Sequence, residues 1–283
     1  MSYDATIYAG TAQHYRFGRP RYSRELRSTL TELCRLDSGP GLDGTGRLLD
    51  VGCGPGSVTV PLADLFDEAV GIDPDPDMLR EAARFAAFEH VGNLRWLQTT
   101  AEDAVRLEPG PFRLITFGQS FWWTDRERVA EAMYDLLEPG GCLALISHCA
   151  TDRPRPIGPD LPPIPHDAIK ELLRRYLGSD RRAGQGLGPQ HPDSIEDALS
   201  RTRFGRPEQH FAPGRPDIVR NSDSVIAGYL SMSSSAPHLF GPNLDHFRAA
   251  MTDLLQHHSP TARFWDWPGD TQLLLARKPA TPM

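Results

Sequence analysis

Lysine is almost absent from this chain of 283 residues. Of its 30 basic residues only Lys170 and Lys278 are lysine, and all the others are arginine. Acidic residues outnumber basic ones, which gives a formal net charge of −7 and no basic surplus of the kind that nucleic-acid binding normally needs. With 26 prolines, the arginine excess indicates a GC-rich genome rather than a binding function. We therefore expect no nucleic-acid partner and favour small molecules as ligands.

Cysteine pairs and long apolar runs are lacking too. The four cysteines show no CxxC spacing, so free thiols in a reducing cytosol are expected. No stretch approaches the ~18 consecutive apolar residues of a membrane span. A signal peptide has a basic region followed by an apolar run, and the first residues of this chain have neither. The sequence thus predicts a cytoplasmic protein with no membrane partner.

Apolar runs alternate with helical patterns from Arg47 onward. The predicted strands are uniformly apolar, and they lie at 48–51, 69–72, 94–97, 112–117 and 142–147. Between them, helices are expected at 58–66, after Asp75, and at 126–137. Repeated βα units with apolar strands predict a parallel sheet covered on both faces.

The flanking segments carry further helical patterns. Leucines at three- and four-residue steps predict a helix over residues 26–36, and residues 37–46 read as a loop. Six prolines at 151–166 exclude a regular element there. Later elements are expected as helices near 167–177, 193–201, 222–232 and 243–256, and as strands near 207–212 and 272–276.

We therefore expect a single domain with a cap. Its predicted parts are an N-terminal helical segment at 1–46, a core at 47–150, a helical cap at 151–270 with one core strand near 207–212, and a last core strand with a tail at 271–283.

A glycine-rich turn follows the first predicted strand. Gly52, Gly54 and Gly56 let the backbone approach a ligand closely. A dinucleotide fingerprint would place its third glycine where this chain has Ser57. Asp50 would repel a phosphate but can face an ammonium group. The alternative to a ligand-binding turn is a tight βα turn that binds no ligand.

Acidic residues end the next two strands. Asp73 follows Gly54 by nineteen residues, which places it at the tip of the adjacent strand, where a carboxylate can accept both hydroxyls of a ribose. Ala101, Glu102 and Asp103 follow the third strand, where a backbone amide and an acid can read an adenine edge. Alternatively, Asp73 only caps a helix, and the two later acids only begin one.

Together these motifs resemble the class I S-adenosylmethionine-dependent methyltransferases, and more narrowly the small-molecule branch with the trans-aconitate and ubiquinone-type enzymes. The similarity extends over about residues 8–148 and is carried by 15–22, 48–57, 70–79, 101–103, 117–125 and 136–143. It implies a Rossmann-like, doubly wound α/β fold with a seven-stranded sheet, mostly parallel with an antiparallel last strand, plus a helical cap and N-terminal helices. It specifies the cofactor but not the acceptor.

The resemblance implies a set of cofactor contacts around the glycine turn. The glycines would approach the methionyl part, Asp73 the ribose, and Arg19 the cofactor carboxylate. The residues predicted to bind S-adenosylmethionine are Tyr15, Arg19, Asp50, Gly52, Gly54, Gly56, Asp73, Met78, Ala101, Glu102 and Gln119. Of these, Ala101 and Glu102 would contact the adenine, Met78 would pack on its face, and Gln119 would also begin the acceptor pocket.

The chain departs from the family pattern at two places. It has Phe112-Arg113 where relatives often have Phe-Asp, and Trp122-Trp123 where they often have His-Trp. A histidine base is therefore missing from that position. Phe121, Trp122 and Trp123 are predicted to form an aromatic wall for a flat or cationic acceptor, or else to pack in the core.

Histidines elsewhere are the candidates for a general base. His148 ends the fifth predicted strand at the carboxyl edge, where open α/β sheets bind ligands, and His14 lies in the N-terminal segment. His257 and His258 are adjacent on a predicted helix and point apart, so no metal site is predicted.

Three functions remain open from the sequence. The first is methyl transfer to a small molecule, with secondary metabolism as a conjectured setting. The second is a non-methylating reaction that keeps the cofactor, such as a cyclisation. The third, a nicotinamide oxidoreductase, is disfavoured by Ser57 and Asp50. The acceptor and the oligomeric state are not encoded in any motif.

Overall fold

The computed structural model describes residues 4–34, 46–107, 110–149, 157–179, 182–183, 186–187 and 191–280. The predicted loop at 37–46, except Gly46, lies outside the described residues, as do Leu36 and residues 151–156 of the proline-rich stretch. The α/β class predicted from the alternating pattern is confirmed, and so is the seven-stranded sheet implied by the resemblance.

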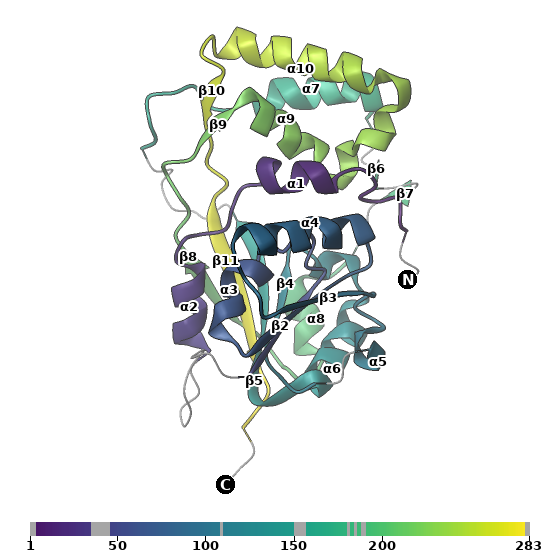
Figure 1. The fold of residues 1–283 in the computed structure, drawn as a ribbon, viewed down its shortest axis with the longest axis vertical. Coiled ribbons are helices and arrows are strands. Elements are labelled where there is room, and N and C mark those ends of the chain that lie inside the picture. Colours follow the sequence, from purple (N-terminus) through teal and green to yellow (C-terminus); the bar gives the residue numbers. More distant parts are fainter. Residues whose placement is uncertain are drawn as a thin grey trace.

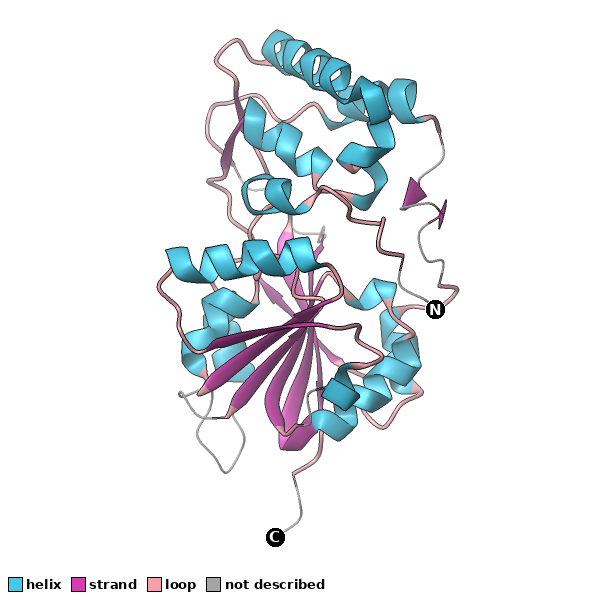
Figure 2. Ribbon diagram, turned by 45° about the vertical axis from the view of Figure 1, so that its right-hand side comes forward, coloured by secondary structure: helices cyan, strands magenta, loops and turns pink. Residues whose placement is uncertain are grey.

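The sheet has the strand order β3-β2-β1-β4-β5-β11-β8. Its strands fan out through the lower half of the molecule with helices on both faces (Figure 2). β11 is antiparallel to both of its neighbours, whereas the other neighbouring pairs run parallel. The seven strands are β1 Arg47–Val51, β2 Glu68–Asp73, β3 Leu94–Gln98, β4 Phe112–Gly118, β5 Leu137–Cys149, β8 Glu208–Ala212 and β11 Asp270–Arg277.

Two apolar layers enclose the sheet, one on each face. The side chains of one layer come from α2 (Leu26–Leu33), α3 (Thr59–Leu62) and the strands. Those of the other come from α5 (Ala104–Leu107), α6 (Arg126–Leu136) and α8 (Ile195–Ser200). α8 had been predicted as part of the cap. Its buried Ile195 and Leu199 pack in this core layer instead, because they present an apolar stripe to α6.

The cap is a separate helical layer above the carboxyl edge of the sheet (Figure 1). It has its own core of buried residues. α1 (Ala12–Gly18) lies between the cap and α4 (Pro76–Phe88), and it contacts both. The cap elements are α7 His166–Leu177, β9 Val219–Asn221, α9 Ser222–Leu230, η3 Ser233–Ser235, η4 Pro237–Asn243, α10 Leu244–His258 and β10 Arg263–Trp265, and near it lies the small pair β6 Arg182–Ala183 and β7 Gly186–Leu187.

Two element boundaries differ from those predicted. The helix after the glycine turn begins at Thr59, one residue after its predicted start at residue 58, because the turn is still closing where the Gly56 amide donates to the Cys53 carbonyl. It continues as the short η1 (Ala63–Leu65). β5 begins at Leu137, five residues early, because Leu137 already pairs with Phe112 of β4 and the backbones of Gly140 and Gly141 bond to Lys278, just past β11.

Arg220 joins the cap to α1. Its guanidinium forms an ion pair with Asp266 at 3.0 Å and donates to the Gly18 carbonyl at 2.6 Å. The side chains of Arg220 and Asp266 are only 10% and 7% exposed. Gly18 is required at this contact because a Cβ there would lie 2.3 Å from the Gly228 backbone nitrogen of α9. α1 is therefore fixed to the cap by a buried charge pair and a close helix contact.

In the part of the chain that the structure describes, no helix combines the length and the apolar character that crossing a membrane requires. The four cysteines are free thiols, as expected.

Breaking the buried ion pair should be costly. Asp266→Ala is expected to lower the free energy of unfolding by about 3–5 kcal/mol, because it leaves the Arg220 charge buried without its partner. Glu171→Ala is the control, since it removes an exposed partner of Arg174 in the same cap and should cost at most about 1 kcal/mol. Urea unfolding of the wild type and the two variants measures the loss of unfolding free energy in each variant. Equal losses in Asp266→Ala and Glu171→Ala would contradict the prediction.

Candidate active site

The glycine turn adopts a backbone that only glycine accepts easily. Gly52, Gly54 and Gly56 all have positive φ, at 63°, 53° and 79°. A Cβ at Gly52 would collide with Ser120, and one at Gly56 would press on Val60. Around Gly54, in contrast, nothing lies within 4 Å of an added Cβ. Gly54 therefore faces open space, as a backbone that cradles a ligand must.

Asp73, at the tip of β2, is bonded to this turn. One carboxylate oxygen accepts from the Gly54 amide at 2.8 Å, and the other accepts from the Asp75 amide at 2.9 Å. Each oxygen keeps a lone pair for a further donor. Burial raises the pKa of Asp73 to about 6, although the two amide bonds favour the charged form. The predicted ribose-binding carboxylate thus lies beside the turn.

Asp50 turns inward rather than toward a ligand. It is 1% exposed, and its two oxygens accept from the hydroxyls of Thr59 and Thr116 at 2.6 and 2.8 Å. Burial raises its pKa to about 6. This placement corrects the expected contact with an ammonium group, because the carboxylate is used to join the turn, the following helix and β4.

The N-terminal segment approaches the same turn, as the resemblance implied. The Arg19 guanidinium stacks over the Tyr15 ring at 4.9 Å and donates to the Ser231 carbonyl of the cap at 3.1 Å. Its Nε is buried and has no hydrogen-bond partner among the described residues. Tyr8 lies within electrostatic range of Tyr15, Arg19 and Asp73, and burial raises its pKa. Arg19 is thus a cation with a buried donor left over near the turn.

The two candidate bases lie in different places. His148 stacks on Tyr22 at 4.8 Å, is hydrogen-bonded to the Pro20 carbonyl, and has a buried Nδ1 with no hydrogen-bond partner among the described residues. Burial lowers the pKa of His148, so its ring is neutral near pH 7. His14 is 3.3 Å from Arg248 of α10, at the cap side of α1. Of the two, only His148 stands at a strand tip of the sheet.

The predicted adenine side is compact. Met78 is 3% exposed and Ala101 is 9% exposed. The Glu102 carboxylate accepts from the Asp125 amide at 3.3 Å, so it also ties the loop after β3 to the start of α6. Their contact with an adenine ring stays a prediction.

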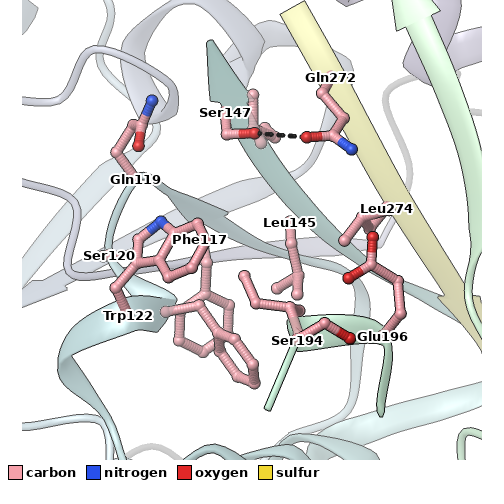
Figure 3. A pocket seen from close by; sticks show the side chains of 13 residues that line it. Phe117, Gln119, Ser120, Trp122, Leu145, Ser147, Ser194, Glu196, Gln272 and Leu274 are labelled. Carbon is pink, nitrogen blue, oxygen red and sulfur yellow. Dashed lines mark hydrogen bonds between the residues drawn. The ribbon is translucent and has the colours of Figure 1, made fainter. Parts of the chain in front are cut away.

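A cavity of about 130 Å³ opens at the tips of β4, β5 and β11 (Figure 3). Gln119 lies at one end of the cavity and has a φ of 60°, which is unusual for a residue other than glycine. Its backbone N–H donates to the Ile146 carbonyl. Ser120 connects the cavity to the glycine turn, since its hydroxyl donates to the Val51 carbonyl at 2.5 Å. The cavity therefore adjoins the glycine turn through Gln119 and Ser120.

The aromatic cluster does not form one wall. In the short helix η2 (Phe121–Trp123), Phe121 is 2% exposed and packs edge-on against Phe117 beneath the cavity. Trp122 is 43% exposed and lines the cavity. Trp123 points elsewhere and packs against Tyr8 with 5.7 Å between the ring centroids. Successive residues on a tight helix cannot share a face, so the predicted wall is reduced to Trp122 above Phe121.

Sequence reasoning missed Tyr8, Tyr22 and Glu196. Tyr22 was visible in the aromatic run of the N-terminal segment, but its stacking on a residue more than a hundred positions away was not. Glu196 lines the cavity from α8 and had no motif around it. Among the described residues, no group of three or more His, Cys, Asp or Glu side chains is placed to hold a metal ion.

Comparisons with known proteins agree with this geometry. A family model described as a methyltransferase domain matches residues 48–141. The chain is 33% identical to a trans-aconitate 2-methyltransferase of Streptomyces avermitilis over 64% of this chain and 60% of that protein. It is 32% identical to a malonyl-[acyl-carrier protein] O-methyltransferase of Enterobacter lignolyticus over 38% of this chain and 41% of that protein.

A solved structure extends the likeness to the whole fold. A candidate type II methyltransferase of Anaeromyxobacter dehalogenans covers 93% of this chain and 99% of its own, with a TM-score of 0.52 and 20% identity. Residues 48–141 are thus a methyltransferase domain. The resemblance to small-molecule class I S-adenosylmethionine-dependent methyltransferases is confirmed, and S-adenosylmethionine is the cofactor of this class. The chain spans about half the length of the curated relatives it matches.

Cofactor binding should depend on the charge of Asp73. Because its pKa is about 6, the carboxylate gains a proton as the pH falls through 6 and loses acceptor capacity. The affinity for S-adenosylhomocysteine is therefore expected to be constant above pH 7 and to fall about tenfold per unit well below pH 6. Titration calorimetry from pH 5 to 8 measures this.

Two variants separate Asp73 from the other buried carboxyl group. Asp73→Asn should bind S-adenosylhomocysteine weakly and lose the fall in affinity at low pH. Asp50→Asn should keep that fall, although the pKa of Asp50 is also about 6. A slope that survives in Asp73→Asn would show that another group titrates.

Proposed function

We propose that this protein transfers a methyl group from S-adenosylmethionine to a small-molecule acceptor. The single observation that carries the proposal is the open space at Gly54, with the Asp73 carboxylate bonded to its amide. A backbone cradle and an acceptor carboxylate at the carboxyl ends of adjacent parallel strands form the ligand site typical of open α/β sheets.

Three features of the chain fit the cofactor. The Gly54 cradle has room for the methionyl part, Asp73 has a free lone pair on each oxygen for the ribose hydroxyls, and Arg19 has a buried Nε without a partner among the described residues for the carboxylate. Tyr15, stacked under that guanidinium, holds it in place. Met78, Ala101 and Glu102 would contact the adenine. Asp50 supports the turn from behind.

The chemistry is an in-line displacement. When bound, the cofactor supplies an electrophilic methyl carbon, which bonds to the acceptor lone pair as the carbon–sulfur bond breaks and its electron pair stays on sulfur. The protein mainly positions the acceptor, and such positioning can contribute ~7–11 kcal/mol. The cavity at the tips of β4 and β5 presents an acceptor next to the turn, with Gln119 between the two sites. α1 and the cap lie above the carboxyl edge of the sheet, and Arg19, at the end of α1, donates to the Ser231 carbonyl of the cap.

His148 is the proposed base where the acceptor must lose a proton. Its neutral ring and free Nδ1 suit proton acceptance, and its stacking on Tyr22 fixes the ring. His14 is the weaker proposal, because its Nε2 faces Arg248.

For the acceptor and its metabolic setting we propose only a general class. Two of the relatives are named for the methylation of trans-aconitate and of a malonyl-[acyl-carrier protein]. For this chain we propose a small-molecule acceptor in secondary metabolism, in the cytoplasm. The alternative, a cyclisation that uses the bound sulfonium as a fixed charge, needs the same cofactor cradle but forms no methylated product.

Cofactor binding and methyl transfer are tested together. S-adenosylhomocysteine should raise the melting temperature and NAD should not. Incubation with methyl-labelled S-adenosylmethionine and a metabolite extract should move label into small molecules. Binding without label transfer would favour the cyclase alternative, and a response to NAD alone would overturn the proposal.

The cradle itself is tested by Gly54→Ala. The added Cβ would occupy the open space and is expected to weaken S-adenosylhomocysteine binding by about tenfold or more, while stability falls by about 1 kcal/mol from backbone strain. Gly205→Ala is the matched control, since Gly205 has a φ of 69° and equally open surroundings, but lies in the loop after α8. Equal affinities in the two variants would contradict the proposed cradle.

Replacing His148 tests the base. If His148 accepts the acceptor's proton, His148→Gln should lower kcat by about 100-fold or more and abolish the fall in rate at low pH, with S-adenosylhomocysteine binding unchanged. Turnover that stays unchanged across pH would remove His148 from this role.

A further inference from the structure

The cavity beside the glycine turn has an apolar floor and a polar rim. The floor is made by apolar side chains of the core layer that includes α8: Phe117, Phe121, Leu145, Ile195 and Leu274. Around the rim stand Gln119, Ser147 and Gln272, with the Ser147 hydroxyl donating to the Gln272 side-chain oxygen at 3.1 Å. That bond leaves the Gln272 amide hydrogens for other partners. The floor suits a carbon skeleton and the rim suits its polar end.

Glu196 is the one ionisable group among the described residues that line this cavity. It is half-buried, and its carboxylate lies beside Leu274, across from the Trp122 indole (Figure 3). No hydrogen bond or ion pair within 4 Å joins it to another described residue. Glu196 lies in the first turn of α8 and interacts with the Arg126 charge, so its carboxylate is balanced only from outside the cavity. A cationic ligand inside the cavity would give it a direct partner.

One cation lies near Glu196 but outside the cavity. The Arg126 guanidinium stacks over Trp122 at 5.2 Å and donates to the Asp193 carbonyl at 2.9 Å. It interacts electrostatically with Asp193 as well as with Glu196. Arg126 therefore shares its charge between two acids on the outer side of Trp122 and does not line the cavity. Among the described residues that line the cavity, Glu196 is therefore the charged one that a ligand would meet directly.

We propose that the methyl acceptor is a small cationic amine, whose ammonium group binds to Glu196 in this cavity against Trp122. The inference rests on the proposed methyl transfer and adds the class of acceptor. An ammonium ion gains a charge-assisted hydrogen bond from the carboxylate and an attraction to the indole ring. A carboxylic acid would place like charges together in a half-buried site.

The size of the cavity limits the amine. At about 130 Å³ it is smaller than the roughly 300–1,000 Å³ of pockets that hold drug-sized ligands. The acceptor is thus a compact amine, or a longer one whose charged end enters the cavity while the rest extends toward the cap. Because an ammonium nitrogen has no lone pair, the methyl group goes to another nucleophilic atom of the acceptor, or to this nitrogen only after its proton has passed to a base.

Matched ligands test the charge preference. Butylamine, benzylamine and ethanolamine are titrated into the complex with S-adenosylhomocysteine, beside the alcohol and the carboxylic acid of the same skeleton. At least one amine is expected to bind about tenfold or more tightly than its alcohol, and the acids are expected to bind most weakly. Acids that bind as well as the amines, or no binding by any amine, would overturn the inference.

Two isosteric variants locate the preference. Glu196→Gln should lose the preference for amines about tenfold, because it removes the charge but keeps the shape. Asp197→Asn should retain it, because it makes the same charge change one residue further along α8, on an exposed side chain. A preference that persists in Glu196→Gln, or that disappears equally in both variants, would overturn the assignment to Glu196.

The affinity for S-adenosylhomocysteine is measured in the same samples. If the product does not bind to the wild type, the proposed function itself fails. If it binds to all three proteins while the amines show no preference, only the acceptor class fails. With labelled S-adenosylmethionine, label should then enter an amine pool and not an acid pool.

Discussion

The bond between the Gly54 amide and the Asp73 carboxylate fixes the geometry of the site. It joins the turn after β1 to the tip of β2, two elements that a ligand must contact at once. Asp50 repeats this arrangement one layer deeper, through Thr59 and Thr116. Both carboxylates are buried, and burial raises the pKa of each to about 6. The site is thus preorganised by charges that the fold keeps out of water, at a cost that only good hydrogen bonding offsets.

Much of the core was predictable from local pattern. Apolar runs separated by helical repeats predicted strands and helices within a few residues, since βα units have strong periodic signals. The position of Asp73 nineteen residues after Gly54 also predicted that the two lie close together. Asp50 was misjudged for a physical reason. The direction of a side chain at a strand end depends on the hydroxyls of Thr59 and Thr116, one of them on another strand, and no spacing rule reveals that pairing.

Contacts between segments that are distant in the sequence could not be predicted either. Helix α8 was assigned to the cap because it lies between cap helices in the chain, but its apolar stripe packs on α6. Glu196 went unnoticed for the same reason, because it becomes a cavity residue only after α8 reaches the tips of β5 and β11. The stacking of Tyr22 on His148 and the edge-on contact of Trp123 with Tyr8 likewise depend on where α1 packs between the core and the cap.

The position of β11 has a consequence for the order in which the molecule is made. The strand at residues 270–277 inserts between β5 and β8 and supplies Gln272 and Leu274 to the cavity. A ribosome delivers it more than two hundred residues after β1, so the nascent chain holds the glycine turn long before it holds the cavity. During that interval β5 presents an open edge, a surface on which other strands can pair. The last strand therefore both completes the cavity and covers the exposed edge of β5.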